Sequence, residues 1–516
     1  MHLETGLLTP HLTALNLSGL YKTCLLQGKT ITVRDKLKLL LYADVITETV
    51  TCEPIHGKVK SETLAKGRLL DHIINIVSFG EFMFAFETLD VVMGNAPDDI
   101  QAVIYAHLSF DHRIDVPRLV GALDRITTII PEILCRADVR RHRFVRLPLE
   151  SRNLVSESTG PLDVGPHFDP RTEPQMKIWL GHDDDQDSMI VVVSHILTDG
   201  RGFIQLLELL ARTYSGKDVP PRNIRTLRPV INGFPVGPQT PDERDGRKLP
   251  VKYLPIDGEG KDRFLPVVKI PADRLARLRE QSHQFQVTLN DILLAAHARV
   301  ACRLLDVPAI LLFCPTDLRP RAGLAELSVA NMTGKYLVAI TVNPDEPFSH
   351  TVNRVHEEMA LQTASNRAYT NLVPLDRARK FLPRRVVDDL IRRTYVVTEP
   401  GYSNMGKLEQ NRLVFDSRQP ASFFMTIGYL PLNAFHLSVT GFASQLTLAC
   451  PVVGNQDRAD AVQGVLNSIV AECESWLSEP VRVNVKADAG NPGDSWRNQS
   501  SQGRTSTPGL RGLAGN

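Results

Sequence analysis

The segment Ser194–Gly200 (SHILTDG) carries the residues of this sequence best suited to chemistry. It lies between an apolar stretch typical of a buried strand, Met189–Val193, and a stretch with helical spacing. An imidazole, with an ordinary pKa of about 6.5, suits general-base work near neutral pH, which makes His195 the candidate base. Asp199 can hold the loop by pairing with a cation, and Gly200 permits a close approach that a Cβ would block. The pattern indicates a general base held at a strand end, where a rigid element can direct it into a cleft.

Two other interpretations of this segment stay open on the residues alone. His195 can be a packed histidine at a strand end, without a catalytic role. A metal site is the second alternative, because His182 and Asp183–Asp185 add residues of the ligand type. However, the sequence contains neither H-E-x-x-H nor an array of histidines and carboxylates at metal-binding spacing. We therefore expect no metal site, and we expect Asp183–Asp185 to form the tip of a hairpin.

The composition is that of a soluble globular protein. The chain has 516 residues, of which 43% are hydrophobic and 23% are charged. Its 59 Lys and Arg balance 58 Asp and Glu, so the net charge of +1 gives no electrostatic footprint for nucleic acid or for an anionic membrane. The longest apolar runs are far shorter than the roughly 18 residues of a membrane-spanning helix, so we expect no transmembrane segment.

The cysteines and the N-terminus both favour a cytoplasmic location. The seven cysteines are odd in number and widely spaced, and no pair forms C-x-x-C. This argues against a disulfide framework and against a cysteine-based zinc site, and is consistent with a reducing compartment. The N-terminus has neither the basic region nor the apolar region of a secretory signal.

The elements that must position His195 divide the chain into five parts. The predicted parts are an unassigned N-terminal extension (1–78), a first lobe with the histidine segment (79–218), a Pro- and Gly-rich linker (219–255), a second lobe (256–484) and a disordered Gly- and Ser-rich tail (485–516).

Strands and helices alternate within the two lobes. The expected strands are Ala102–Phe110, Met176–Leu180, Met189–Val193, Leu265–Ile270, Leu311–Cys314, Lys335–Val342, Leu432–Thr440 and Gln445–Val452, and the expected helices are Val116–Ile129, Gly202–Tyr214, Asn290–Leu305 and Ala459–Trp476. Thr288 and Asp291 form a Thr-x-x-Asp capping box at the start of the third helix. Antiparallel-looking strand pairs within this alternation predict a mixed α/β or α+β fold.

In its motifs the sequence resembles the superfamily of CoA-dependent acyltransferases with an H-x-x-x-D-G motif. That superfamily includes chloramphenicol acetyltransferase, condensation domains of nonribosomal peptide synthetases, wax ester synthases and polyketide-associated acyltransferases. Besides His195–Gly200, the stretches similar to it in order and spacing are Thr288–Ala296 (TLNDILLAA), Asp317–Arg321 (DLRPR) with Asn331–Gly334, and Tyr402–Gly406 (YSNMG). The resemblance covers about residues 80–480.

The sequence departs from this superfamily at two places. Many condensation domains have two adjacent histidines, and here Ser194 stands in place of the first. The D-F-G-W-G block of some branches is absent, and Ser403–Gly406 occupies a comparable place. The second departure weakens the link to plant-type acyltransferases and to typical peptide-synthetase domains, and it favours a free-standing enzyme that forms esters or amides.

The resemblance implies two chloramphenicol-acetyltransferase-like lobes that form a pseudo-dimer with an active-site tunnel between them. His195 would take a proton from an acceptor hydroxyl or amine as it attacks a thioester carbonyl. Asn404 is a candidate donor to the oxyanion or to the substrate, beside backbone N–H groups. No covalent acyl-enzyme is required, which agrees with the absence of a G-x-S-x-G segment.

The resemblance also assigns supporting residues. Asp199 would be structural, paired with Arg319, with Arg321 in reserve; the alternative is a solvated Arg319. Ser403 is a candidate substrate contact. Arg384 and Arg385 belong to a basic helical stretch that can meet the phosphates of CoA or an acidic carrier protein, although a solvated helix face is the alternative.

The expected function is therefore acyl transfer from a CoA or carrier-protein thioester to an alcohol or amine, in lipid or secondary-metabolite synthesis. No cofactor is expected beyond acyl-CoA or a phosphopantetheinyl thioester as co-substrate. The expected partners are the acyl-CoA or acyl carrier protein and a small acceptor, without nucleic acid. The alternatives are a non-catalytic condensation-like scaffold that binds a carrier or acyl chain, and a thioester hydrolase.

Overall fold

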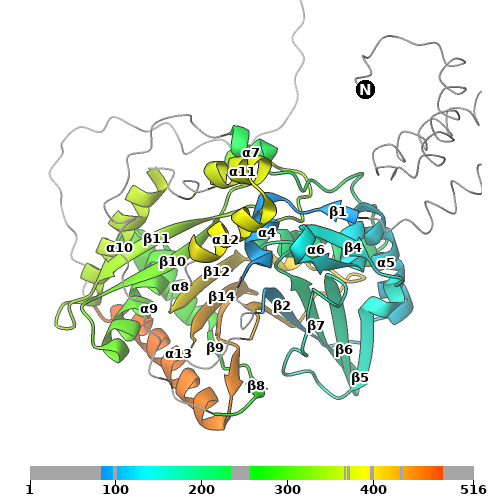
Figure 1. Cartoon of the computed structure of the whole chain (residues 1–516). Helices are drawn as coiled ribbons and strands as arrows, with labels where there is room; N and C mark the ends of the chain where they lie inside the picture. Colours follow the sequence, from blue (N-terminus) through cyan, green and yellow to red (C-terminus); the bar gives the residue numbers. More distant parts are fainter. Residues whose placement is uncertain are drawn as a thin grey trace, which may run out of the picture.

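The computed structural model describes residues 83–96, 101–233, 259–364, 372–394, 400–429 and 434–479, together with residues 256 and 368 (Figure 1). The predicted N-terminal extension 1–78, the predicted tail 485–516 and residues 234–255 of the predicted linker lie outside the described residues. The described chain is a mixed α/β structure, as predicted from the alternation of strands and helices.

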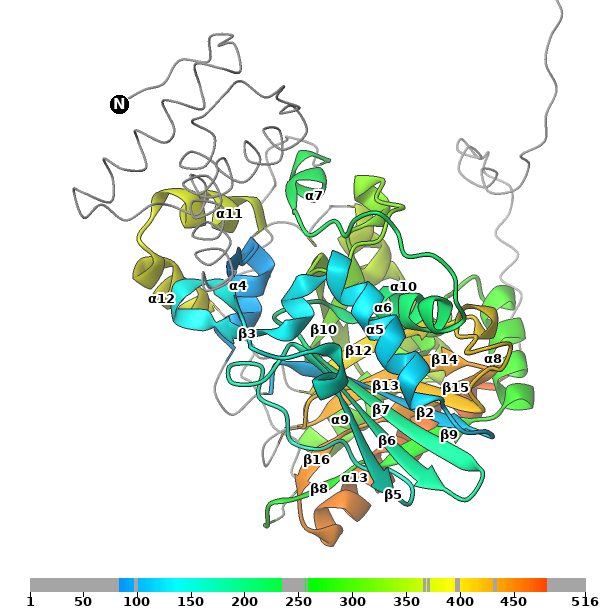
Figure 2. The same ribbon diagram turned by 90° about the vertical axis from the view of Figure 1, so that its right-hand side faces the viewer.

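A five-stranded sheet carries the histidine segment at one end. Its order is β13-β2-β7-β6-β5, with β2 (Val103–Phe110), β5 (Val155–Thr159), β6 (Met176–Asp183), β7 (Gln186–Ser194) and β13 (Ser422–Ile427). Neighbouring strands are antiparallel, except that β5 and β6 are parallel. Helices α5 (Val116–Ile129) and α6 (Gly200–Tyr214) share a core with one face of this sheet, to which alternate residues of β7 such as Val191 and Val193 belong (Figure 2).

A smaller antiparallel sheet lies beside the first helix of the described chain, α4 (Thr88–Gly94). Its order is β1-β4-β3, with β1 (Met83–Ala85), β3 (Cys135–Asp138) and β4 (Arg143–Arg146). The short 3-10 helices of this half are η1 (Pro131–Leu134), η2 (Val139–Arg141) and η3 (Ser151–Leu154), and α7 (Arg228–Asn232) lies in the described part of the predicted linker.

The second half of the chain builds a separate core around a four-stranded sheet, β12-β14-β15-β9, and two strand pairs, β10-β11 and β16-β8. Its strands are β8 (Asp262–Phe264), β9 (Val267–Ile270), β10 (Ala309–Asp317), β11 (Thr333–Thr341), β12 (Gly401–Lys407), β14 (His436–Phe442), β15 (Gln445–Ala449) and β16 (Val452–Gly454). Its helices are α8 (Ala272–Gln284), α9 (Leu289–Leu305), α10 (Phe348–Ala364), α11 (Leu372–Phe381), α12 (Arg384–Thr394), α13 (Gln456–Trp476) and the 3-10 helices η5 (Pro320–Ala322) and η7 (Gln410–Arg412).

Two segments of the second half pack against the first. Strand β13 pairs with β2 along its whole length, so the first sheet contains a strand from the range 256–484. Helix α12 places Val387 and Ile391 in the core of the first half, at 1% and 3% exposure. β13 and α12 therefore hold the two halves of the chain together. A boundary drawn at one residue number does not separate the two cores.

Several predicted elements coincide with observed ones, and the differences have local causes. The helix Val116–Ile129 is confirmed, and so is the capping box of Thr288 and Asp291. The strand predicted at Leu265–Ile270 is observed in shortened form as β9 (Val267–Ile270), because Pro266 has no N–H to donate to a sheet and separates it from β8, which ends at Phe264. The hairpin predicted between Met176–Leu180 and Met189–Val193 has a tighter turn, because β6 runs to Asp183 and β7 starts at Gln186.

Candidate active site

His195 lies at the corner between the end of β7 and the start of α6. Its backbone N–H donates to the carbonyl oxygen of Ala102 at 2.7 Å, and the N–H of Ile196 donates to the Ser194 hydroxyl oxygen at 3.1 Å. The imidazole is half-buried, and its Nδ1 is buried without a hydrogen-bond partner among the described residues. The main chain on both sides of the ring is thus held in place, and the burial of Nδ1 leaves Nε2 as the ring nitrogen that can face a substrate.

Asp199 caps α6 and forms a buried ion pair with Arg319. Both side chains are 2% exposed; Nη2 of Arg319 lies 3.0 Å from Oδ1 of Asp199, and Nη1 lies 3.1 Å from Oδ2. Burial by itself would raise the pKa of Asp199, but Arg319 and the hydrogen bonds hold that pKa below the ordinary 3.8. The predicted pair is confirmed, and the alternative of a solvated Arg319 is wrong. Arg321, the reserve partner, donates to the carbonyl of Thr363.

The Asp199 carboxylate also accepts hydrogen bonds from three neighbouring residues. The N–H of Gly202 donates to Oδ1 at 2.8 Å, while the N–H of Met332 and the hydroxyl of Thr333 donate to Oδ2 at 2.6 and 2.8 Å. Met332 and Thr333 belong to the second half of the chain. Asp199 therefore joins the histidine corner (Ser194–Asp199) to the second half of the chain. With these contacts made, its carboxylate is not directed toward a substrate.

Asn331 holds the histidine corner from the other side. Its Nδ2 donates to the carbonyl oxygens of His195 at 2.9 Å and Ile196 at 3.0 Å, and to Oδ1 of Asp90 at 2.9 Å. Asp90 is fully buried, its pKa is raised by burial, and Nη2 of Arg225 lies 2.7 Å from its Oδ2. Asn331 belongs to the motif Asn331–Gly334, from which no role was predicted for it, and Asp90 and Arg225 lie in no motif that would predict their contacts.

A side chain is tolerated less well at Gly202 than at Gly200. A Cβ on Gly200 would lie 3.0 Å from Sδ of Met405, which brings β12 against the start of α6. A Cβ on Gly202 would lie 2.1 Å from Oγ1 of Thr198 and 3.0 Å from Nη2 of Arg319. Gly200 therefore admits the second half of the chain, as expected of a close approach, while Gly202 makes room for the buried ion pair.

The predicted residues Ser403 and Asn404 lie on β12. Nδ2 of Asn404 donates to Oδ1 of Asn290 at 3.0 Å, and Oδ1 of Asn404 accepts from the N–H of Gly406 at 2.9 Å. Asn290 also accepts from the hydroxyl of Tyr402 at 2.8 Å. One of the two Nδ2 hydrogens of Asn404 is thus used within the protein, and its role toward an oxyanion stays a prediction.

His436, at the start of β14, is the hydrogen-bond partner of Ser403. Its Nε2 and the Ser403 hydroxyl oxygen are 2.8 Å apart, and its ring covers Gly401, where a Cβ would lie 2.1 Å from Nδ1. Burial and then the charge of the nearby His195 lower the pKa of His436 to about 4. His436 is therefore neutral near pH 7. A lone histidine in a strand pattern gives no signal of this placement.

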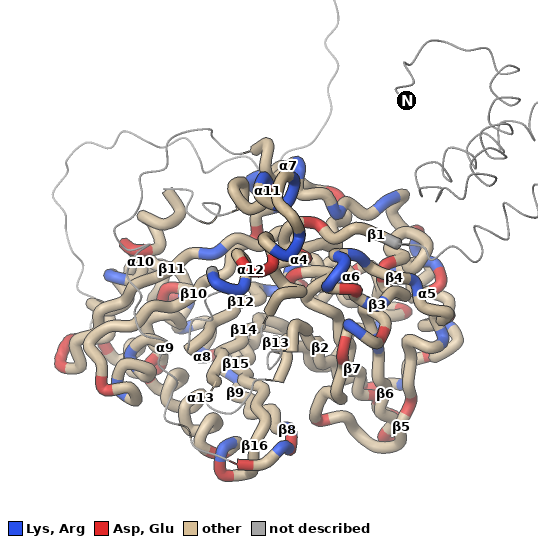
Figure 3. Tube along the Cα trace, viewed as in Figure 1, with Lys and Arg blue, Asp and Glu red and all other residues tan. Residues whose placement is uncertain are grey.

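The predicted basic residues Arg384 and Arg385 are exposed at the start of α12, and no residue of the histidine corner contacts them in the hydrogen bonds and ion pairs of the described chain. Figure 3 shows basic stretches on α11 and α12, next to α4. Further along the same helix, Arg392 lines a cavity with residues of the first half. The role of Arg384 and Arg385 toward phosphates or a carrier stays a prediction.

The described residues contain neither a metal-ligand cluster nor a membrane-spanning helix. No group of three or more His, Cys, Asp or Glu within them is placed to hold a metal ion. None of their helices is both long and apolar enough to cross a membrane. Five of the seven cysteines lie in the described chain; all five are buried, and they form no disulfide with one another.

Comparisons with known proteins show the fold. No protein-family model matches the sequence, and no curated protein matches it. Among solved structures, polyketide synthase associated protein 5 from Mycobacterium tuberculosis superposes with a TM-score of 0.54 at 12% identity, over 76% of this chain and 98% of that chain. The first condensation domain of the calcium-dependent antibiotic synthetase, in complex with a substrate analogue, gives 0.54 at 16% identity, over 78% and 97%.

A third structure, the epimerization domain from the third module of tyrocidine synthetase B, gives a TM-score of 0.52 at 12% identity, over 77% of this chain and 96% of that chain. The chain therefore has the condensation-domain fold, with its pair of chloramphenicol-acetyltransferase-like halves, as the resemblance in sequence motifs predicted. At this identity the superpositions establish the fold and leave the chemistry to be argued from the site.

Proposed function

We propose that the protein is an acyltransferase that moves an acyl group from a CoA or carrier-protein thioester to an alcohol or amine, with His195 as the general base. The observation that carries this proposal is the placement of His195. Its backbone is fixed by Ala102 in the first half and by Asn331 in the second, and His436 of the second half lies near its ring. Such rigid support is what a base needs to meet a reacting proton in one geometry.

The reaction balances with His195 alone as the proton carrier. Because Nδ1 is buried, Nε2 takes the proton of the acceptor O–H or N–H as that oxygen or nitrogen bonds to the thioester carbon. The carbonyl electron pair moves onto oxygen and gives a tetrahedral oxyanion, for which the second Nδ2 hydrogen of Asn404 is the proposed donor. The C=O bond re-forms as the C–S bond breaks, and the thiolate takes the proton back from the imidazolium.

His436 has a different part in this proposal. With a pKa of about 4, its imidazole is a weak base and stays neutral while His195 works. A neutral ring beside His195 avoids the repulsion that a second positive charge would add when His195 becomes an imidazolium. We therefore assign the base to His195 and a neutral, hydrogen-bonding role to His436 and Ser403.

The test is the release of free thiol from a panel of acyl-CoAs, with and without mixed alcohols and amines. The variant is His195→Ala, and the matched control is His350→Ala, which removes an exposed histidine of α10. We expect acceptor-dependent release by the wild type and by His350→Ala, and loss of it in His195→Ala with an unchanged melting temperature.

Other outcomes of this assay would replace the proposal. Release without an acceptor would identify a thioester hydrolase. Release by His195→Ala at the wild-type rate would remove the assignment of the base. No release from acyl-CoA or from acyl-pantetheinylated carrier protein would identify a non-catalytic scaffold.

A further inference from the structure

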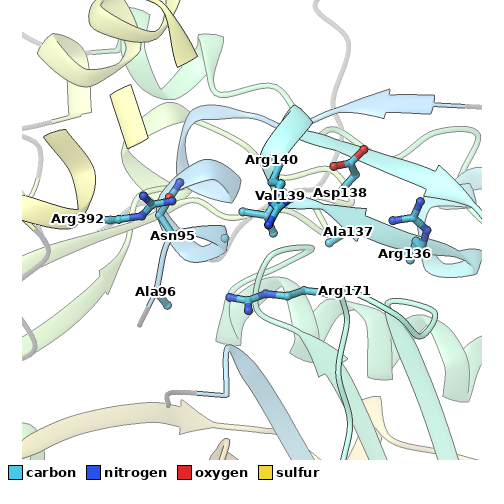
Figure 4. A pocket seen from close by; sticks show the side chains of 10 residues that line it. Asn95, Ala96, Arg136, Ala137, Asp138, Val139, Arg140, Arg171 and Arg392 are labelled. Atoms are coloured by element: carbon cyan, nitrogen blue, oxygen red, sulfur yellow. The ribbon is translucent and has the colours of Figure 1, made fainter. Parts of the chain in front are cut away.

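A cavity of about 820 Å³ lies apart from the residues assigned to catalysis. It is bounded by the end of α4, by the β3–η2 segment, by the loop before β6 and by α12 (Figure 4). Its lining residues are Gly94, Asn95, Ala96, Arg136, Ala137, Asp138, Val139, Arg140, Arg171 and Arg392. Four arginines from three separate parts of the chain thus surround one space of the size that holds a small molecule.

Arginines outnumber carboxylates among the described residues of the lining. The carboxylate among these described residues, Asp138, is directed away from the space that Arg171 enters (Figure 4), and it accepts from Arg143 at 3.1 Å and from Arg141 at 3.4 Å. Those two arginines are not part of the lining. Burial would raise the pKa of Asp138, but the two arginines lower it overall, so its charge is present and already paired. The cavity therefore favours an anion.

The second half of the chain is docked so that it completes this cavity. Oδ1 of Asp388 on α12 lies 2.8 Å from Nε2 of His142 and accepts from Nδ2 of Asn95 at 2.9 Å. Arg392 is four residues further along the helix and so lies on the same face as Asp388. The basic wall of the cavity is thus held by specific contacts between the two halves.

Asn95 adds a second recognition group. The residue is 5% exposed, and its Oδ1 is buried without a hydrogen-bond partner among the described residues. An unsatisfied carbonyl oxygen beside arginines suits a ligand that combines an anion with an N–H donor.

The cavity lies at the same end of the first sheet as His195. Ala137 of the lining donates to the carbonyl oxygen of Pro170 at 2.7 Å, and the side chain of Gln175 donates to that same oxygen at 2.8 Å. The carbonyl oxygen of Gln175 accepts from the N–H of Ser194 at 2.9 Å, and Ser194 directly precedes His195. These hydrogen bonds connect the wall of the cavity to the segment that carries His195.

We propose that this cavity binds the phosphate-bearing end of a free CoA thioester, the 3′-phospho-ADP group; this rests on the proposed function. Several guanidinium groups around one space suit a ligand with several phosphates better than the single phosphate of a carrier-bound pantetheine. The adenine amino group supplies the N–H donor that Asn95 lacks. The predicted phosphate contacts Arg384 and Arg385 do not line this cavity, and Arg392 of the same helix does.

The binding test uses adenosine 3′,5′-bisphosphate and CoA as probes in titration calorimetry with the full chain. The variant Arg140→Gln/Arg392→Gln changes two exposed arginines of the lining, and the control Arg222→Gln/Arg412→Gln removes the same charge at exposed positions elsewhere. Since losing a hydrogen bond to a charged group weakens binding by about tenfold or more, we expect the lining variant to bind at least about tenfold more weakly and the control to bind like the wild type. Absence of binding by the wild type, or equal binding by the lining variant, would overturn the proposal.

A kinetic test separates this proposal from the proposed function. Acyl-pantetheine carries the same thioester without phosphates, so the lining variant should raise the KM for acyl-CoA and leave the KM for acyl-pantetheine unchanged. Turnover of carrier-bound donors alone would overturn the CoA site and keep the acyltransferase. If no donor is turned over, the acyltransferase proposal fails, and the calorimetry with adenosine 3′,5′-bisphosphate still decides whether the cavity binds phosphates.

Discussion

The guanidinium of Arg319 meets the carboxylate of Asp199 at two points, 3.0 and 3.1 Å, in a site where both side chains are 2% exposed. This buried ion pair fixes the end of the H-x-x-x-D-G segment to the second half of the chain. Charges at this depth are costly when they lose their partner, so the pair makes the histidine corner dependent on the docking of the two halves.

Asp199→Ala removes one of the two carboxylates that pair with the buried Arg319, the other being Asp317 at 2.9 Å. The loss should lower the free energy of unfolding by up to about 3–5 kcal/mol. Denaturant unfolding of wild type and variant measures this loss. The double variant Asp199→Leu/Arg319→Met removes both charges and should be less destabilised than the single change. A fully stable Asp199→Ala protein would show that the pair does not support the fold.

Asn331→Ala removes three hydrogen bonds, two of which hold the carbonyl oxygens of His195 and Ile196. We expect a loss of about 100-fold in kcat with little change in KM, because a small displacement of a base costs rate and not binding. Asn223→Ala is the control, since Asn223 bonds the backbone of Val329 and not the histidine corner. Equal kcat values in the two variants would contradict a positioning role for Asn331.

Gly202→Ala should destabilise the protein strongly, because its Cβ would lie 2.1 Å from Oγ1 of Thr198. The control is Gly121→Ala in α5, where a Cβ would meet nothing within 4 Å. Alanine at that exposed helical position should raise stability by up to about 1 kcal/mol. Melting temperatures that move in opposite directions would support the crowding at Gly202; a tolerated Gly202→Ala would contradict it.

Acid should destabilise the protein through its buried histidines. Burial lowers the pKa of His297 to about 3 and that of His107 to about 3. Between their ordinary pKa of 6.5 and these folded values, the unfolded chain binds protons that the folded chain does not, so stability falls as the pH falls below 6.5. Each such histidine contributes about 1.4 kcal/mol per pH unit in this window.

His297→Leu isolates one of these contributions. Both ring nitrogens of His297 are buried without partners in the described chain, so leucine removes a group that cannot be protonated in place. Urea unfolding at pH 7.5, 6.0 and 5.0 should give a shallower pH dependence for the variant. The difference between the two proteins cancels the opposite effect of buried carboxylates such as Asp90, whose pKa is raised. Parallel curves would show that His297 does not couple to folding.

Patterns of neighbouring residues predicted much of the local structure and the central residues of the site. The helix Val116–Ile129, the capping box at Thr288 and the corner that carries His195 follow from spacing and residue type within one or two turns of chain. Motifs in the right order predicted the condensation-domain fold and the pairing of Asp199 with Arg319. These features were accessible because each depends on a short stretch whose residues act together locally.

Only the tertiary structure decided which distant residues contact the residues of the site. Asp90 and Asn331 are 241 positions apart, Ser403 and His436 are 33 apart, and β13 crosses into the sheet of the other half. Arg392, not Arg384 or Arg385, lines the basic cavity because Asp388 docks α12 on the first half. Such contacts arise from the packing of two cores against each other, and packing between distant segments leaves no periodic trace in the sequence from which to predict it.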